Sequence, residues 1–377
     1  MNLQRKDIIV NVLRSMKMIR MINFSPSSDI GPLCFDISIT SRCNHKCYFC
    51  KTHSSLVSDE QEHTTIPEPI MKMFLEDCVE LGVQEILFSG EGEPFLVKYL
   101  PEMIIEYGKK IRIKVLTNGS TLHKIVSPRL LDNIYKLTIS LNSINRETHK
   151  LIHGYRDNCQ FDGIMQGINK VLEIPRVREK LQINYVITED NINEFDSVIE
   201  MSNRKNIFFA MRPLGISFEE LKSRRLQKDV LRELSVKIEY QLKKTHHNQQ
   251  AIATLRFVHE SLSVVAKVEK EENELLPCYS GFYWGHIQGN GDYSICCHGS
   301  RELGNIKEES ICKIWKSKET QSEIYSAVLM CETNIPVCSS CYRCRDPHMY
   351  SALFHKYFSA VPFQLAMLRF WKSRKSG

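Results

Sequence analysis

Three cysteines lie within eight residues near the start of the chain, at Cys43, Cys47 and Cys50. They follow an apolar run, residues 33–39, that is typical of a buried strand. Thiolates grouped this closely favour zinc or an iron–sulfur cluster over disulfides. A four-iron cluster takes four cysteines, so three would leave one iron open to a substrate or cofactor, as in catalytic zinc sites. A structural zinc knot is the alternative.

A second group of cysteines follows residue 277, where glycines also become frequent. Cys278 and Cys296 come first, and a closely spaced set follows: Cys338, Cys341 and Cys344. This spacing suits an iron–sulfur cluster, and a zinc ribbon is the alternative. Between them, residues 282–297 alternate around Gly289–Asp292, which predicts a β-hairpin. A helix is expected over about 308–328.

Strand-like and helix-like segments alternate between residues 33 and 214. We predict strands at 33–39, 84–89, 111–116, 135–141, 181–187 and 206–211, with helices between them such as 69–82. Six β–α units imply parallel strands with right-handed crossovers. The expected fold class is α/β, as an open doubly wound sheet or a partial (β/α)6 TIM-like barrel. In both, the loops after the strands converge at one edge, and the first cysteine group lies in such a loop.

Polar motifs follow three more of the predicted strands. The second strand ends in Ser89-Gly-Glu-Gly-Glu-Pro94, the third in Thr117-Asn-Gly119 and the fourth in Ser140-Leu-Asn142. Glycines let backbone groups approach a ligand closely, and small polar side chains can hold hydroxyl and carboxylate groups. We therefore expect a ligand site at this edge of the sheet.

Residues 33 to about 214 resemble the radical S-adenosylmethionine (radical SAM) enzymes. The resemblance rests on the Cys-x3-Cys-x2-Cys spacing, with Phe49 before its third cysteine, and on Gly-x-Gly-Glu-Pro at 90–94. The resemblance implies a [4Fe-4S] cluster on Cys43, Cys47 and Cys50 that binds SAM and splits it reductively. The resulting 5′-deoxyadenosyl radical would take a hydrogen atom from a substrate carbon. Glu91 departs from the glycine of many members. The implied cofactor-binding residues are Phe49, Gly90, Gly92, Glu93, Pro94, Asn118, Ser140 and Asn142.

The late cysteines resemble the C-terminal auxiliary-cluster domains of that family, called SPASM in the full form and twitch in the short form. The full form has seven cysteines for two clusters, whereas no cysteine follows Cys344 here. The resemblance therefore implies one auxiliary [4Fe-4S] cluster that relays electrons, held by Cys278, Cys296, Cys338 and Cys341, with Cys344 as the alternative to Cys341. Glu91, Arg212 and Cys297 are unranked candidates for a catalytic base or hydrogen-atom donor.

Composition indicates a cytoplasmic protein. Hydrophobic residues make up 42% and charged residues 25%, and we find no membrane span or signal peptide. The net charge of +6 is spread along the chain and does not indicate nucleic acid. We expect an N-terminal helical extension (1–32), the partial barrel (33–214), a solvated helical connector (215–276), a small α+β cysteine-rich domain (277–347) and a C-terminal helical tail (348–377). His246 and His247, in the connector, are expected in solvent.

The leading hypothesis for function is a radical SAM oxidoreductase or epimerase acting on a sugar- or aminocyclitol-like small molecule. An electron donor such as flavodoxin or ferredoxin would serve it. A peptide- or protein-modifying radical SAM maturase is the alternative within the family. The alternative from another class is a non-catalytic protein that binds zinc and a nucleotide.

Overall fold

The computed structural model describes residues 31–57, 63–155, 160–214, 219–244, 246–268, 280–297 and 301–328. Most of the expected N-terminal extension (1–32) and all of the expected C-terminal tail (348–377) lie outside these residues. So do four of the proposed auxiliary ligands: Cys278, Cys338, Cys341 and Cys344. Within the described part of the chain, no helix is long and apolar enough to cross a membrane.

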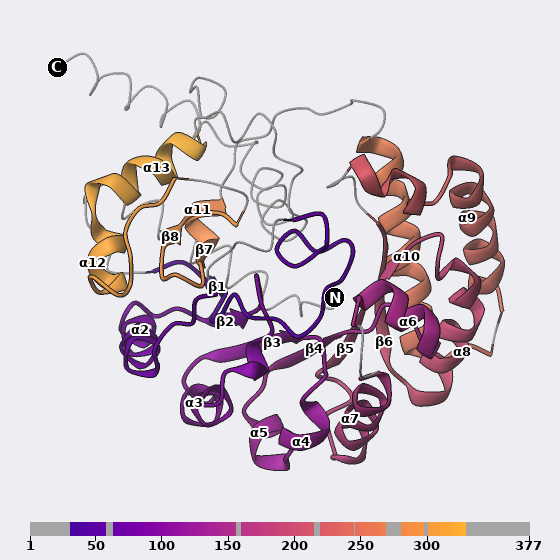
Figure 1. Cartoon of the computed structure of the whole chain (residues 1–377), viewed down its shortest axis with the longest axis horizontal. Coiled ribbons are helices and arrows are strands. Elements are labelled where there is room, and N and C mark those ends of the chain that lie inside the picture. The colour runs from indigo at the N-terminus through magenta and orange to yellow at the C-terminus, as the bar shows by residue number, and fades with distance from the viewer. Residues whose placement is uncertain are drawn as a thin grey trace.

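An eight-stranded, mostly parallel sheet runs through the molecule (Figure 1). Its strand order is β6-β5-β4-β3-β2-β1-β7-β8, and only β8 runs antiparallel to its neighbour. All six predicted strands are present, which confirms the α/β class. The strands are β1 (Cys34–Ile37), β2 (Glu85–Phe88), β3 (Arg112–Thr117), β4 (Lys136–Ser140), β5 (Leu181–Ile187), β6 (Phe208–Pro213), β7 (Trp284–Ile287) and β8 (Tyr293–Ser294).

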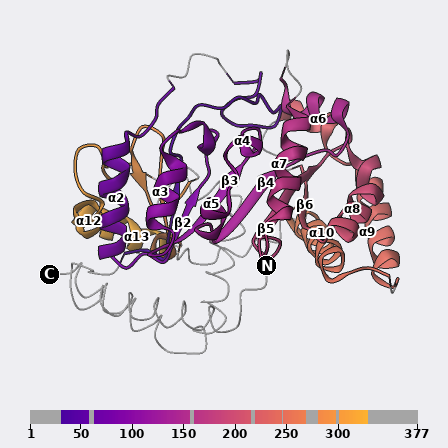
Figure 2. The same ribbon diagram turned by 90° about the horizontal axis from the view of Figure 1, so that it is seen from below.

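Helices alternate with the first six strands, and α2, α3, α5 and α7 lie on one side of the sheet (Figure 2). The helix predicted over 308–328 is divided into two, α12 and α13. The helices are α2 (Glu68–Glu80), α3 (Leu100–Tyr107), α4 (Leu122–Ile125), α5 (Pro128–Asp132), α6 (Arg146–His153), α7 (Phe161–Glu173), α8 (Phe195–Lys205), α9 (Lys228–Leu242), α10 (Gln249–Val268), α11 (Ser280–Tyr283), α12 (Ile311–Lys316) and α13 (Lys318–Val328).

The two faces of the sheet differ in polarity. Along β3, β4 and β5, buried and half-buried residues alternate with the period of two that a strand imposes. Ile113 and Leu137 are fully buried, whereas Lys114, Thr138 and Asn184 are half-buried on the other face. When a parallel sheet is buried on both faces, the sequence of each strand is a nearly continuous run of apolar residues. Along β3, β4 and β5, the second face of the sheet is therefore mainly polar rather than a second apolar core.

The predicted hairpin is present, and its first strand joins the main sheet. β7 and β8 pair antiparallel across a turn in which Gly291 has a φ of 99°. β7 also pairs in parallel with β1, and Ser38 N beyond the end of β1 donates to Ile287 O at 2.8 Å. Gly285 lies beside the Phe35 ring, which occupies the space that a Cβ would need. The C-terminal region thus extends the same sheet that carries the first cysteine loop.

Residues 215–276 contain helices as predicted, but the prediction of a solvated connector was wrong for α10. This helix packs on β6, where Thr254 Oγ1 accepts a hydrogen bond from Phe209 N at 2.9 Å. Leu255 and Val258 of α10 are fully buried. Charged residues are frequent in the segment as a whole and obscure the apolar stripe of this one helix in the sequence.

Candidate functional site

The first cysteine group lies in the loop after β1, and Cys43, Cys47 and Cys50 are each half-buried. Burial raises the pKa of the Cys47 thiol well above its ordinary value, and the neighbouring thiols of Cys43 and Cys50 raise it further. The backbone N–H groups of Thr52 and His53 donate to Cys50 Sγ at 3.4 and 3.3 Å. Three adjacent thiols with amide donors directed at sulfur fit a metal cluster, because a cation would offset the cost of burying thiolates.

The loop after β2 packs directly against the cysteine loop. Glu93 N donates to Arg42 O at 2.8 Å. A Cβ at Gly92 would overlap the backbone oxygens of Thr40 and Arg42 and lie 2.9 Å from Arg42 N. The sequence suggested that this glycine makes room for a ligand. In the structure it makes room for the backbone that leads into Cys43.

Two other members of the 90–94 motif contact β1 and the hairpin. Gly90 has a φ of 94°, and a Cβ there would collide with Ser38 Oγ. Glu91, a candidate catalytic residue, accepts a hydrogen bond from Gly289 N at 3.3 Å in the turn between β7 and β8. Its carboxylate therefore connects the loop after β2 to the C-terminal hairpin. Pro94 is buried and begins a 3-10 helix that ends at Leu96.

The buried carboxylate of Glu93 joins the ends of β2 and β3. Its Oε1 accepts from Thr117 Oγ1 at 2.6 Å and from Phe95 N at 3.1 Å, and its Oε2 accepts from Asn118 N at 2.6 Å. Burial raises the pKa of this carboxyl to about 7, while the three donors act in the opposite direction. Because all three contacts donate to the carboxylate, this side chain serves to hold the strand ends together.

Asn118 contacts the cysteine loop directly, whereas the amide of Asn142 contacts β5 and the end of α6. Asn118 Nδ2 donates to Asn44 Oδ1 at 2.8 Å and lies 3.9 Å from Cys43 Sγ. Asn142 Oδ1 accepts from Val186 N at 2.8 Å. The end of β3 thus contacts the loop after β1 directly, and Asn142, which joins the ends of β4 and β5, contacts that loop through His153.

Three buried histidines that the sequence analysis did not single out lie behind Cys47: His45, His149 and His153. His153 Nδ1 is 3.1 Å from Cys47 Sγ, and the His149 ring stacks on the His153 ring at a centroid distance of 4.0 Å. Burial lowers the pKa of His45 to about 4 and that of His149 to about 3. The available signal was the i, i+4 spacing of His149 and His153 directly before Gly154, which ends α6.

Acid should destabilise the folded protein through this histidine cluster. Burial is the main cause that keeps the pKa of His149 near 3, and the neighbouring His45 lowers it further. Between that value and about 6.5 the unfolded chain binds more protons, so stability falls with falling pH by up to roughly 1.4 kcal/mol per unit for one histidine. The variant His149→Phe should show a flatter dependence of the free energy of unfolding on pH between 6 and 4, measured by urea denaturation.

The exposed His246 offers a control for that measurement, since His246→Gln should leave the slope as in the wild type. A slope that is unchanged in His149→Phe would show that another group governs the acid sensitivity.

Of the proposed auxiliary ligands, the structure describes Cys296. It follows β8, is half-buried and packs against the hydrophobic core. Cys297, a candidate hydrogen-atom donor, is exposed. The other proposed ligands lie outside the described residues, so the ligand set stays a prediction.

The remaining predicted residues have simpler surroundings. Phe49 is half-buried and meets Tyr48 edge to face at 5.3 Å, and Ser140 is half-buried at the end of β4. The guanidinium of Arg212 lies 5.3 Å from the centre of the Phe257 ring in α10. Arg212, near the end of β6, thus packs on α10.

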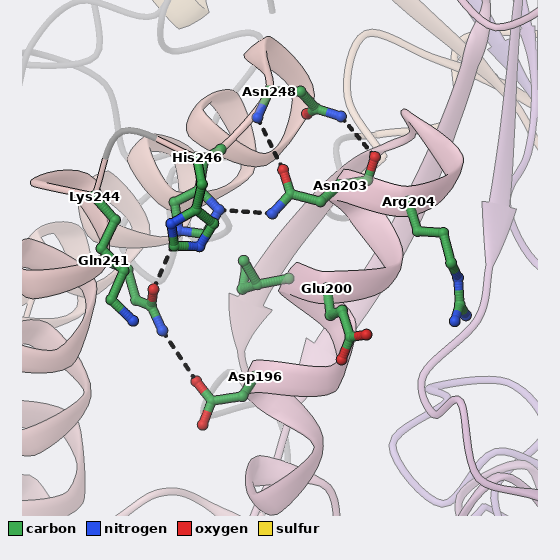
Figure 3. Close-up of a pocket in the computed structure, with 10 residues that line it drawn as sticks. Asp196, Glu200, Asn203, Arg204, Gln241, Lys244, His246 and Asn248 are labelled. Carbon is green, nitrogen blue, oxygen red and sulfur yellow. Dashed lines mark hydrogen bonds between the residues drawn. The ribbon is translucent and has the colours of Figure 1, made fainter.

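A separate cavity of about 640 Å³ lies between α8, the end of α9 and the start of α10 (Figure 3). Its polar groups bond to one another: Asn203 Nδ2 lies 2.6 Å from His247 Nδ1, and Gln241 Nε2 donates to Asp196 Oδ1 at 3.4 Å. His246 is exposed as predicted, but His247 is half-buried and bonded, so that prediction was wrong for His247. None of the predicted site residues lines this cavity.

Residues 37–202 match the family model of the radical SAM superfamily, and residues 278–345 match that of the SPASM iron–sulfur cluster-binding domain. The chain contains a radical SAM domain followed by a SPASM domain. The radical SAM match extends from the end of β1 into α8 and includes every strand-end motif described above. The SPASM match begins at Cys278 and ends one residue after Cys344. The predicted resemblance is confirmed, and the predicted cofactors, SAM and [4Fe-4S] clusters, are those of the two domains.

Curated proteins similar to this radical SAM chain include GTP 3′,8-cyclases. A probable GTP 3′,8-cyclase of Archaeoglobus fulgidus is 29% identical over 171 residues, which cover 45% of this chain and 54% of that protein. The GTP 3′,8-cyclase of Clostridium botulinum is 28% identical over 186 residues, 48% of this chain and 56% of that protein. The chain spans about half the length of the curated relatives it matches.

Solved structures share the fold of this radical SAM chain at low identity. SuiB of Streptococcus suis, bound to the precursor peptide SuiA, has a TM-score of 0.56 and 17% identity, covering 83% of this chain and 71% of that one. The structure of anSMEcpe with bound AdoMet and Cp18Cys peptide has a TM-score of 0.54 and 16% identity, covering 92% and 99%. At these identities the likeness shows the fold alone.

Proposed function

We propose that this protein is a radical SAM enzyme in which Cys43, Cys47 and Cys50 hold a [4Fe-4S] cluster with one iron open to SAM. The observation that carries the proposal is the convergence of strand ends on the cysteine loop. Glu93 and Asn118 connect the ends of β2 and β3 to that loop. When bound, the cluster supplies one electron to the C–S bond of SAM, which gives methionine and a 5′-deoxyadenosyl radical able to abstract a hydrogen atom.

The chain itself positions these groups. In the proposed complex the backbone at Gly92 and Glu93 binds the methionine ammonium of SAM. The bond from Glu93 N to Arg42 O holds this backbone against the cysteine loop. The bonds of Asn118 to Asn44 hold the loop from the other side. These bonds fix the positions of the two loops, and a reactive radical needs such fixed positions because a loosely held substrate would divert it.

The substrate we propose first is a sugar- or aminocyclitol-like small molecule that is dehydrogenated or epimerised, with flavodoxin or ferredoxin as the electron donor. The polar face of the sheet supports this proposal, because Lys114, Thr138 and Asn184 lie half-buried there. Lys114 is paired with Glu85, and Asn184 accepts a hydrogen bond from Gln182. A molecule rich in hydroxyls would exchange hydrogen bonds with such groups. Modification of a peptide side chain is the second candidate, since peptide-bound proteins share the fold.

The test begins with the full chain purified without oxygen. It should be brown and hold on the order of eight irons if two four-iron clusters form. After reduction with dithionite, it should convert SAM to 5′-deoxyadenosine. Deuterated candidate substrates, namely aminocyclitols, peptides and GTP, are then compared by deuterium transfer into 5′-deoxyadenosine. A colourless, zinc-loaded protein that leaves SAM intact would refute the proposal in favour of the zinc alternative.

Loss of the auxiliary cluster should leave SAM cleavage intact. Replacing Cys296 by alanine is expected to remove about four irons while the reduced protein still forms 5′-deoxyadenosine. Turnover of the substrate should be lost, because the electron left on the substrate radical has no acceptor. Iron analysis and product assays on the same sample measure both effects, and Cys338→Ala should behave alike.

Cys312 in α12 is also half-buried and serves as the matched control, since Cys312→Ala should keep the full iron content. Equal loss of SAM cleavage and turnover in Cys296→Ala would argue against separate roles for the two centres.

A further inference from the structure

The C-terminal end of α6 lies directly against Cys47. The residues on both sides of this cysteine donate backbone hydrogen bonds to the last carbonyls of the helix: Lys46 N to His153 O at 2.8 Å, and Tyr48 N to Ile152 O at 3.1 Å. Carbonyl groups at a helix end have no partner within the helix. Here the cysteine loop supplies the donors, so the helix end and the loop hold each other in place.

The two ends of α6 show why the sequence places it there. Asn145 caps the start, and its side chain accepts from Glu147 N and Thr148 N. Gly154 ends the helix in the left-handed conformation with a φ of 64°. A Cβ on Gly154 would collide with Lys46 O, so glycine also permits the close approach of the helix to the loop.

The side chain of His153 has a defined direction of hydrogen bonding. Asn142 Oδ1 accepts from Val186 N, which orients the amide so that its Nδ2 faces His153 Nε2 at 3.4 Å. An amide nitrogen donates and does not accept, so Nε2 is the acceptor and the ring hydrogen is on Nδ1. His153 Nδ1 lies 3.1 Å from Cys47 Sγ.

A second acceptor lies equally near, because His45 Nδ1 is also 3.1 Å from His153 Nδ1. An ionised acceptor forms the stronger hydrogen bond. When Cys47 is a thiolate that binds iron, its sulfur is therefore the favoured partner.

We propose that His153 is a positioning residue for the iron–sulfur cluster, and that it donates its Nδ1 hydrogen to the sulfur of Cys47. This inference rests on the proposed role of Cys47 as a cluster ligand. Groups that hydrogen-bond to metal ligands fix the orientation of those ligands, and hydrogen bonds to sulfur set the potentials of iron–sulfur clusters. A donor N–H stabilises the reduced cluster more than the oxidised one, because the reduced cluster carries one more negative charge.

The test compares variants of the full, iron-loaded chain. In His153→Phe, which keeps the ring but removes the donor, the ratio of reduced to oxidised cluster at a given potential should fall about tenfold, or about 59 mV for a one-electron couple. Potentiometric titration followed by electron paramagnetic resonance (EPR) measures this shift. Electron–nuclear double resonance in H2O and D2O should also show the loss of one exchangeable proton coupled to the reduced cluster. His153→Gln, which restores an N–H donor, should recover both signals.

His149 is the matched control, since it lies one turn earlier in the same helix, is equally buried and has its Nδ1 bonded to Tyr155 Oη. His149→Phe should keep the wild-type potential and proton coupling.

The outcomes distinguish the two proposals. A His153→Phe chain with full iron, wild-type potential and wild-type proton coupling would overturn the inference while the cluster itself stands. If that variant loses iron, His153→Gln decides: the wild-type coupling supports the donor, and its absence overturns it. A wild-type chain without any four-iron EPR signal would instead overturn the proposed function.

Discussion

A chain in which Cys47 is replaced by alanine is expected to lose about four irons and all detectable formation of 5′-deoxyadenosine. Cys47 is the middle of the three cysteines in the loop after β1, and its backbone is held on both sides by α6. Without its sulfur the cluster has two thiolates in place of three, and the open iron that would bind SAM is no longer held. Iron analysis, EPR of the reduced protein and chromatography of the SAM cleavage products measure the loss.

Cys34 provides the matched control, because it is a buried thiol in β1 that precedes the same loop. Cys34→Ala should keep its iron and its cleavage activity, at a modest cost in stability. Wild-type rates of SAM cleavage in Cys47→Ala would remove this loop from the proposed chemistry.

The second large effect is expected from Gly92→Ala. The added Cβ would overlap two backbone oxygens, those of Thr40 and Arg42. Backbone atoms fixed by hydrogen bonds between the two loops cannot yield as a flexible side chain does. We expect the free energy of unfolding to fall by about 3 kcal/mol or more. The SAM-binding cluster should be lost as well, because the displaced backbone leads directly into Cys43. Chemical denaturation and iron analysis test both parts.

Gly163→Ala tests whether the effect belongs to the position rather than to the substitution. Gly163 lies inside α7, and a Cβ there would lie 3.1 Å from the His123 ring, a side chain that can shift. Alanine in a helix is favoured over glycine by up to about 1 kcal/mol. This variant should keep its iron and lose little or no stability. If Gly92→Ala also kept its iron and stability, the proposed contact between the two loops would be wrong.

The parts of the fold that follow local sequence patterns were predictable. Each of the first six strands is a short apolar or alternating run, and its boundaries differ from the prediction by at most two residues. Because parallel strands place their carboxyl ends at one edge, the sequence also predicted that Glu93, Asn118 and Asn142 would lie near the cysteine loop. Hydrogen bonds between these residues and the loop, or through His153, confirm that arrangement.

The parts that depend on distant pairs were not predictable from local patterns. Cys47 and His153 are 106 positions apart, and no periodicity relates them. The pairing of β7 with β1 joins residues about 250 positions apart, and the hairpin pattern alone does not indicate which strand it would meet. The role of Gly92 was likewise hidden, because a glycine that admits a ligand and one that admits another backbone look identical in sequence.

The ladder between β1 and β7 has a consequence for electron transfer. The loop with Cys43, Cys47 and Cys50 leaves the sheet from β1, and Cys296 follows the hairpin that β7 begins. Two redox centres anchored on adjacent strands would keep a constant separation, since a hydrogen-bonded sheet does not flex as a hinge between domains does. The rate of electron tunnelling depends steeply on the distance between the two centres. That rate would then be set by the sheet rather than by motion of one domain relative to the other.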